Sequence, residues 1–238
     1  MAFSGSALFK GRHFQDRLIV LCVRWYLRYC LTLRDLEEMM AERGLQVDHS
    51  TVGRWVLRYA PELYQRMRRE VRFPNRSWRV DETLIKVRGQ WKYLYRAVDS
   101  SGETIDFLLS EQRDAATAKR FLVNALAETA PVRPRVINVD GHAAYPPAIS
   151  ELKAEHQLDA HCRCRRAPYL NNVLEQDHRF VKKRIAASLW FQSGETAVRT
   201  IAGYEAMHMI RKGQVRWLGK GDVLGQIAFI EDTLGVAA

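Results

Sequence analysis

Hydrophobic residues recur every three to four positions through the first 64 residues, a period that predicts three helices. The first, Phe14 to Tyr29, is apolar around most of its circumference, so we expect most of its surface to be buried. The second begins at Thr32, with an acid three residues later as in a capping box, and Gly44 ends it. The third begins at Ser50 and should stop before Pro61.

Two helices joined by a glycine-containing turn have the layout of a helix-turn-helix DNA-binding motif. Ser, Thr and Arg near the start of the third helix suit DNA phosphates and base edges. These side chains are Ser50, Thr51, Arg54 and Arg58. A small helical bundle with a merely solvated polar face fits the same pattern. We predict a helix-turn-helix domain over residues 1–64 and a basic linker over 65–77, whose Arg68 and Arg69 would contact phosphates.

From Trp78 the pattern changes to the alternation typical of strands. Strands are expected over 78–87, 91–98, 104–109, 135–139 and 159–162, and helices over 114–126, 145–155, 171–187, 195–213 and 222–234. Three antiparallel strands followed by alternating helices and strands make a mixed α/β sheet with helices on both faces. We therefore predict an α/β core over residues 78–190 and a C-terminal helical extension over 191–238.

The composition predicts a soluble globular protein of one to two domains, with 238 residues of which 47% are hydrophobic. No apolar run reaches the roughly 18 residues that a membrane helix needs, and the N-terminus lacks the pattern of a secretory signal. Four cysteines in so long a chain do not form a disulfide framework. A cytoplasmic protein in a reducing compartment is therefore expected.

The distribution of charge suggests a polyanionic partner. Lys and Arg number 37 against 27 Asp and Glu, which gives a net charge of +10. The net charge is +7 over residues 1–80, −2 over 81–160 and +5 over 161–238. Two basic arms around a slightly acidic centre suit a protein that grips DNA around a metal site. Charge alone also supports solubility, so this hypothesis depends on the motifs.

Three carboxylates stand where the ends of secondary-structure elements could bring them together. Asp81 lies within the first strand, Asp140 follows a short apolar strand, and Glu175 lies in the first turns of a helix. Carboxyl ends of strands open onto the crevice where α/β proteins bind ligands. Acids gathered there repel each other unless a cation joins them, and Mg²⁺ takes such oxygen ligands. Taken singly, each acid also fits a cap or a solvated surface residue, and Glu82 is an equally plausible neighbour of Asp81.

The order and spacing of these acids resemble the catalytic blocks of DDE-type bacterial insertion-sequence transposases. The blocks are WRVDET, VINVDGHAAYP and NNVLEQDHRFVKKR, and 34 residues separate Asp140 from Glu175. The closer resemblance is to the short, single-frame, replicon-fusing (cointegrate-forming) insertion-sequence family, and it extends from Phe14 to Gly213. It includes TLRDLEEMMAERGLQVDHSTVGRWV before the core and AGYEAMHMIRKGQ after it.

The resemblance implies a ribonuclease-H-like core that cleaves DNA and transfers strands with Mg²⁺, for which Mn²⁺ could substitute. It implies that Asp81, Asp140 and Glu175 are the catalytic and metal-binding residues. Binding of the element's terminal inverted repeats and of target DNA, by a homodimer or larger homo-oligomer, is also implied. No membrane is involved, and the implied location is the bacterial cytoplasm near the nucleoid.

The helix that carries Glu175 has two faces that fit this resemblance. Glu175, Arg179 and Lys182 share one polar stripe, since residues three, four and seven apart lie on one face. The related enzymes place a Lys or Arg seven residues after the glutamate, which gives Lys182, with Arg179, a DNA-binding role. A solvated Glu–Arg pair is the simpler alternative. The stripe expected to turn toward the sheet is Leu174, His178, Val181 and Ile185.

Other interpretations stay open from the residues alone. A helix-turn-helix transcription regulator with an α/β ligand or partner domain would not need the three acids. A ribonuclease-H-like nuclease without transposition would not need the N-terminal reader. Tyr145 and Tyr169 could suggest a tyrosine recombinase, but neither has an Arg-His-Arg arrangement around it. The segment HCRCRR, from His161, lacks the spacing of a zinc knuckle, so its arginines would touch DNA or solvate a loop.

Overall fold

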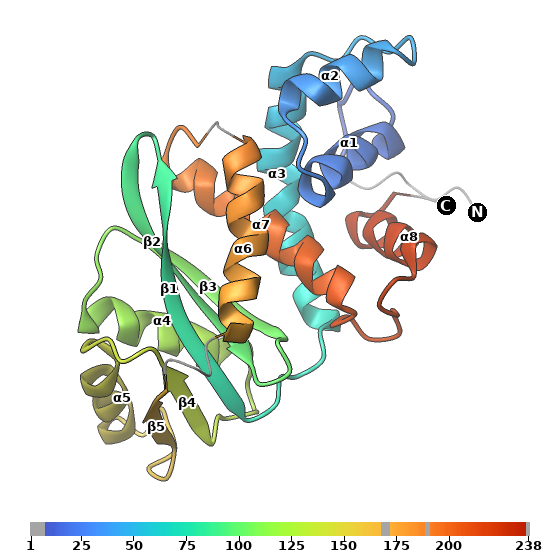
Figure 1. The fold of residues 1–238 in the computed structure, drawn as a ribbon. Helices are drawn as coiled ribbons and strands as arrows, with labels where there is room; N and C mark the ends of the chain where they lie inside the picture. The colour runs from blue at the N-terminus through green and yellow to red at the C-terminus, as the bar shows by residue number, and fades with distance from the viewer. Residues whose placement is uncertain (1–7, 168–171, 189–190, 237–238) are drawn as a thin grey trace. The chain divides into compact units, whose positions relative to one another are not determined.

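The computed structural model describes residues 8–167, 172–188 and 191–236, which form two compact units (Figure 1). The helical unit comprises Met1–Arg72 with Lys183–Ala238, and the sheet unit comprises Phe73–Lys182. The C-terminal helices, expected as a separate extension, therefore group with the N-terminal ones. Within the described ranges, none of the helices combines the length and the apolar character required to cross a membrane.

The helical unit is organised around two long helices that contact each other, α3 and α7. Almost every side of α7 is buried, since it also contacts α1. The helices of this unit are α1 (Asp16–Arg28), α2 (Leu33–Ala41), α3 (His49–Met67), α7 (Gly194–Lys212) and α8 (Val223–Leu234), with a short 3₁₀ helix, η1 (Arg68–Glu70). Burial on most sides from Thr200 to Ile210 puts this part of α7 at the centre of its unit.

The start of α2 confirms the capping box expected there. The Thr32 hydroxyl accepts a hydrogen bond from the Asp35 backbone N–H at 3.1 Å, and the Asp35 carboxylate accepts one from the Thr32 N–H at 2.7 Å. Gly44 ends this segment with a φ of 72°. The Asp48 carboxylate then caps α3 by accepting the Ser50 N–H at 2.8 Å. Local polar groups therefore fix the first turns of both α2 and α3.

The prediction that Pro61 stops the third helix is wrong, because α3 continues through it to Met67. Proline lacks the N–H that would bond to the carbonyl four residues back, which weakens a helix interior. Ala60, Leu63 and Met67 are nevertheless buried on either side of the proline. Burial of this apolar face outweighs the lost hydrogen bond. The first residues of the expected linker are consequently helical.

The sheet unit contains a five-stranded mixed sheet in the order β3-β2-β1-β4-β5. Antiparallel pairs join β1 to β2 and β2 to β3, and parallel pairs join β1 to β4 and β4 to β5. The strands are β1 (Ser77–Val87), β2 (Gln90–Asp99), β3 (Thr104–Ser110), β4 (Val136–Val139) and β5 (Arg163–Arg166), and the helices are α4 (Ala115–Glu128), α5 (Tyr145–Ala154) and α6 (Asn172–Ser188). This arrangement confirms the expected mixed α/β sheet.

The last strand lies four residues beyond the range expected for it. The predicted segment, 159–162, forms a turn in which the Cys162 N–H bonds to the Asp159 carbonyl at 2.9 Å. The strand itself is Arg163–Arg166, whose four side chains are all exposed. Its backbone pairs with β4, while its charged side chains protect an exposed sheet edge. No hydrophobic alternation marks such a strand.

The core of the sheet unit lies on the face that α4 and α5 cover. Trp78 and Val80 on β1, with Val139 on β4, point into this core. Helix residues Phe121 and Tyr145 pack against them and are fully buried. Because successive strand residues point to opposite faces, Arg79 and Asp81 belong to the other face of β1.

That other face carries a buried ion pair to α6. Arg96 Nη2 lies 2.7 Å from Asp177 Oδ2, and the exposed fractions of the two side chains are 0% and 7%. Leu174, His178 and Val181 of α6 are buried as expected, and Ile185 is half-buried. The residues of α6 up to Lys182 group with the sheet unit. The burial predicted for Leu174, His178 and Val181 is therefore confirmed, whereas Ile185 belongs to the helical unit.

Gly203→Ala should destabilise the helical unit by about 1–2 kcal/mol. A Cβ at Gly203 would lie 2.6 Å from the Ala60 Cβ and 2.7 Å from the Leu27 Cδ2, so α7 could no longer approach α3 as closely. Overpacking costs about 1–3 kcal/mol, and contacts below 3 Å to two buried side chains place this change at about 2–3 kcal/mol, against a gain in helix propensity of about 1 kcal/mol. Urea unfolding measures the change. Gly219→Ala is the control, since its Cβ would meet only the Asp222 Cβ at 3.8 Å; equal stability of the two variants would contradict this close packing.

Asp177→Asn should lower the free energy of unfolding by about 3–5 kcal/mol, because the buried Arg96 loses the charge it contacts. The matched control is Glu111→Gln, which removes an acid 2.6 Å from Lys92 whose side chain is 75% exposed. Exposed pairs contribute roughly 0–1 kcal/mol. Thermal and urea unfolding of both variants give the comparison. Similar losses in the two would show that burial does not strengthen the Arg96–Asp177 contact.

Candidate active site

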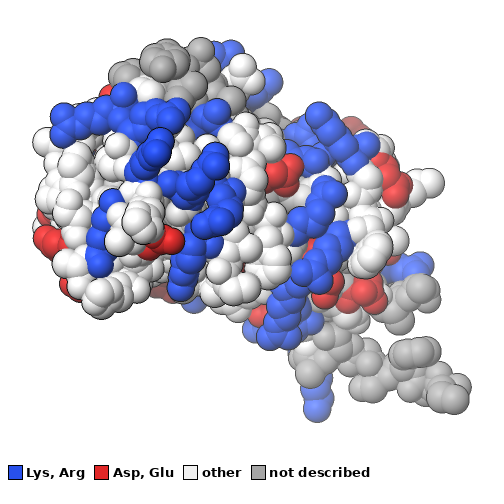
Figure 2. All heavy atoms as spheres, turned by 90° about the horizontal axis from the view of Figure 1, so that it is seen from below, with Lys and Arg blue, Asp and Glu red and all other residues white. Residues whose placement is uncertain are grey.

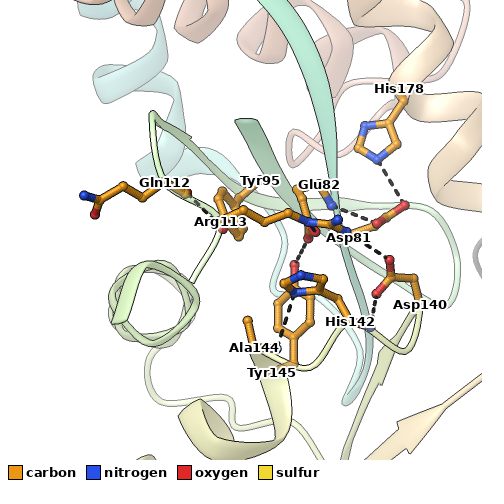
Figure 3. A network of polar contacts seen from close by, with 10 residues as sticks. All are labelled: Asp81, Glu82, Tyr95, Gln112, Arg113, Asp140, His142, Ala144, Tyr145 and His178. Atoms are coloured by element: carbon orange, nitrogen blue, oxygen red, sulfur yellow. Dashed lines mark hydrogen bonds and ion pairs between the residues drawn. The ribbon is translucent and has the colours of Figure 1, made fainter. Parts of the chain in front are cut away.

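Asp81 and Asp140 lie side by side because of the register between β1 and β4. Val80 pairs with Val139 in parallel, and each aspartate follows its valine directly. Both valines point into the core, so both aspartates belong to the opposite face, the one that bears α6. One carboxylate oxygen from each of Asp81, Asp140 and Glu82 lies within 4.8 Å of the others (Figure 3).

Short local contacts orient the two aspartates. Asp140 accepts the backbone N–H of His142 at 2.8 Å, in a turn that Gly141 makes with a φ of 110°. Asp81 Oδ1 accepts the Glu82 N–H at 2.8 Å, and its Oδ2 lies 3.6 Å from the His178 Nε2 of α6. The two carboxylates keep 16% and 31% of their side-chain surface exposed. They remain accessible to a ligand from solvent.

Glu82 belongs to the core face and is already engaged there. Only 2% of its side chain is exposed. Its Oε1 accepts a hydrogen bond from Arg113 Nε, and its Oε2 accepts one from the Tyr145 hydroxyl. Both oxygens therefore have protein partners. This distinguishes Glu82 from Asp81, although the two are adjacent in sequence.

Arg113 offsets the negative charge of the site. Its Nη2 lies 3.5 Å from Asp140 Oδ2, while its Nε contacts Glu82, so one guanidinium bridges two of the acids (Figure 3). Partial burial alone would lower the pKa of Arg113, but the hydrogen bond and charge of Glu82, with the charge of Asp140, raise it above its usual value. Arg113 therefore stays charged.

Tyr145 is a hydrogen-bond donor in this network. It is fully buried, and burial together with the charge of Glu82 raises its pKa well above the usual value of 10. A buried phenol with a raised pKa is a poor nucleophile, so its position gives no support to a tyrosine-recombinase mechanism. Tyr169, the other tyrosine considered, lies outside the described residues.

Glu175 lies on the exposed side of α6 with Arg179 and Lys182, which are also exposed. Its carboxylate is not among the acids that lie within 4.8 Å of one another in the described chain. The structure thus brings two of the three predicted acids together and places the third on the helix that covers their face. Asp177, two residues after Glu175, is paired with Arg96.

Sequence reasoning missed the side chains that hold the acids in place. His178 was assigned only to the buried stripe, Tyr145 only to a rejected nucleophile, and Arg113 to nothing. The single sequence signal for Arg113 is its position just before Asp114, whose carboxylate caps α4. A cap fixes where a helix begins and not where the preceding side chain points.

The predicted DNA-reading side chains lie on one side of α3. Ser50 and Arg54 are exposed, Thr51 is half-buried, and Arg54 Nη2 donates to the Thr51 hydroxyl at 2.8 Å. Arg58 Nη2 donates to the Leu8 carbonyl at 3.2 Å. Arg69 is exposed, while the Arg68 guanidinium lies 5.5 Å from the centre of the Tyr64 ring. Lys and Arg side chains are widespread on the face drawn in Figure 2.

A second group of possible metal ligands joins α2 to α3. His49 Nδ1 lies 3.0 Å from Glu37 Oε2 and 3.5 Å from Asp48 Oδ2. These contacts act within the helix-turn-helix, where they connect the first residue of α3 to α2. In the HCRCRR segment, burial raises the pKa of Cys162 to about 11, so its thiol is neutral.

Comparison with known proteins identifies the family. Residues 75–214 match the family DDE_Tnp_IS240, described as a DDE domain. The chain is 38% identical over 210 residues to the transposase for insertion sequence-like element IS431mec of Staphylococcus aureus, covering 88% of this chain and 91% of that protein. The transposase for insertion sequence element IS257 in transposon Tn4003, also from Staphylococcus aureus, matches with the same identity and coverage.

Two solved structures show a more distant similarity. One is the HTLV-2 integrase catalytic core domain in complex with magnesium, with 16% identity and a TM-score of 0.43 over 61% of this chain and 95% of that chain. The other is the simian T-cell lymphotropic virus intasome in complex with PP2A regulatory subunit B56 gamma, with 18% identity and a TM-score of 0.44 over 59% and 49%. The family match and the Staphylococcus relatives, which extend over most of the chain, show that this protein belongs to the DDE transposases of insertion sequences.

Proposed function

We propose that this transposase binds the terminal inverted repeats of its own element through α3 and catalyses DNA cleavage and strand transfer at Asp81, Asp140 and Glu175. The observation that carries the proposal is the pairing of Asp81 with Asp140 on the face of the sheet that α6 covers. A transcription regulator would not need this arrangement of acids. The reaction takes place on DNA in the bacterial cytoplasm, near the nucleoid.

The carboxylates fit a hard divalent cation. One oxygen from each of Asp81 and Asp140 lies within 4.8 Å of the other, and Mg²⁺ prefers oxygen ligands from one or two carboxylates together with substrate phosphates. Mn²⁺, which takes the same type of ligand, would substitute. When bound between two such acids and a phosphodiester, divalent ions activate the attacking oxygen and stabilise the leaving oxygen.

The surrounding residues hold this site in a reactive arrangement. Asp81 and Asp140 supply the fixed carboxylates, and Glu175 supplies a third from α6. His178 orients Asp81, since it is buried and its Nε2 lies 3.6 Å from that carboxylate. Arg113 reduces repulsion among the acids until a cation binds. No enzyme side chain becomes covalently attached to DNA in this scheme.

The exposed cations of α6 would hold DNA beside the acids. Arg179 and Lys182 are exposed on the same face as Glu175. Lys and Arg bind phosphate through charge and several N–H donors. We place the scissile strand across this face, with Lys182 on a phosphate. A homodimer or larger homo-oligomer would bring two element ends and a target DNA together.

Glu175→Gln should leave binding of the element's ends intact and reduce strand joining by several orders of magnitude. The change keeps size and helix propensity but removes the charge that a divalent cation needs. A gel shift with end DNA measures binding, and Mg²⁺-dependent joining of a pre-cut end to a plasmid measures the reaction. The matched control is Glu155→Gln, which changes an exposed acid of the sheet unit that pairs with Lys119.

Lys182→Ala separates phosphate binding from metal binding in the same assay. Its joining should fail at a lower salt concentration than that of the wild type, because one phosphate contact is missing and salt weakens those that remain, yet activity should persist at low salt. Near wild-type joining by Glu175→Gln would overturn the three-acid mechanism.

Arg54→Ala should weaken binding to the element's end more than binding to random duplex. Base-edge contacts carry specificity, whereas phosphate contacts hold any sequence and carry the salt dependence. Arg68→Ala or Arg69→Ala should weaken binding to both DNAs by the same factor. Fluorescence anisotropy with the two duplexes gives the ratio. If Arg54→Ala lowered the affinity for both duplexes equally, Arg54 would be a phosphate contact, and Ser50 and Thr51 would be the residues that read the bases.

A further inference from the structure

The segment before α1 lies against the helix proposed to read DNA. The Phe9 ring stacks on Tyr59 of α3 with centroids 4.7 Å apart, and the Phe14 ring meets Trp55 edge-on at 5.2 Å. Phe9 is only 4% exposed. Arg58 of α3 also donates a hydrogen bond to the Leu8 carbonyl at 3.2 Å. Two aromatic contacts and one hydrogen bond therefore fix residues 8–14 on α3.

A basic groove of about 400 Å³ lies between this segment and α3. Its lining contains three arginines and a histidine and no acid. The lining residues are Gly11, Arg12, His13, Phe14, Thr51, Arg54, Trp55 and Arg58. The segment and the helix contribute to the same concave surface, and both belong to the helical unit.

Donors in this groove remain available to a ligand. Arg12 and His13 are exposed, and neither side chain makes a hydrogen bond or an ion pair to the part of the chain that the structure describes. Arg54 is held at the groove by Thr51, at 2.8 Å. Guanidinium and imidazole N–H groups on a concave surface match the oxygens of a phosphate.

A larger hollow in the helical unit does not have this purely basic charge. It measures about 920 Å³ and includes the exposed Trp217. Both signs of charge line it, with Arg66, Arg69 and Arg216 against Glu62, Glu70, Asp222 and Asp232. Four acids against three arginines leave this hollow without a net positive charge, so the smaller groove is the better anion site.

We infer that Arg12 and His13 form a backbone-phosphate site for duplex DNA, beside the bases that Thr51 and Arg54 read. The inference rests on the proposed function of α3 and extends the reader to a segment outside the helix-turn-helix. Phe9 and Phe14 set the distance between the phosphate site and the reading helix. A phosphate held there fixes the register of α3 on the DNA, since phosphate contacts position a protein without specifying sequence.

Arg12→Ala should reduce affinity for end DNA and for random duplex by the same factor, roughly fivefold to tenfold at 0.1 M salt. The slope of log affinity against log salt should fall by about 0.9, the value for one lost phosphate contact. Fluorescence anisotropy of the full chain over a series of KCl concentrations measures both quantities. Arg12→Lys should restore most of the slope, because it keeps the charge.

Lys10→Ala is the matched control, because Lys10 is exposed on the same segment but does not line the groove. Its slope should change far less than that of Arg12→Ala. Equal slopes of log affinity against log salt for the two variants would contradict the site, because any positive charge on the segment would then have the same effect. A loss confined to end DNA would also overturn it, by making Arg12 a base contact.

Phe14→Ala tests the anchoring directly. It should reduce the effect of a second change, Arg12→Ala, because a detached segment no longer holds Arg12 in the groove. Full additivity of the two changes would contradict the anchoring. If the wild-type chain bound end DNA and random duplex equally well, the result would contradict the proposed reading function of α3. The phosphate site in the groove is tested separately, by the salt slopes of Arg12→Ala and Lys10→Ala.

Discussion

The parallel pairing of β1 with β4 is the constraint on which the candidate active site depends. It sets Val80 opposite Val139, and both valines are anchored in the core under α4 and α5. A shift of this register by one residue would turn the buried set of β4 to the opposite face. Burial of the valines therefore fixes the position of the aspartates that follow them. The packing of these two valines in the core therefore sets the geometry of the candidate active site.

Gathering acids at one sheet edge is costly, and the surrounding residues reduce the cost. Two carboxylates 4.8 Å apart repel by roughly 3–4 kcal/mol at an effective dielectric constant of about 20. Arg113 bridges Glu82 and Asp140, and Tyr145 donates to Glu82. These contacts keep Glu82 on the core side. Asp81 and Asp140 are left as the carboxylates open to a cation.

The two ion pairs around this site have different roles. Arg96 and Asp177 are almost fully buried and join α6 to the sheet, so they set where the helix of Glu175 can lie. Arg113 is one-third exposed and contacts acids that a cation would also bind, so it can yield to that cation. The Arg96–Asp177 pair fixes α6 on the sheet, and Arg113 balances the negative charge of the acids.

The sequence by itself determined the class of fold, and the resemblance of its motifs predicted the three acids. The strands β1 to β3 and the capping box at Thr32 follow from local signals and appear in the structure as expected. The spacing from Asp140 to Glu175 is a longer-range signal, and the structure brings together Asp81 and Asp140. Tertiary structure decided three other points. It allows α3 to continue past Pro61, because burial of the residues before and after the proline outweighs one lost hydrogen bond.

Tertiary structure also placed β5 on a run of exposed arginines, because pairing with β4 depends on backbone groups and leaves no side-chain period. Finally, it separated Asp81 from Glu82. Adjacent strand residues have the same local sequence environment, and only the positions of α5 and α6 on opposite faces show which carboxylate is tied to the core and which faces the proposed site.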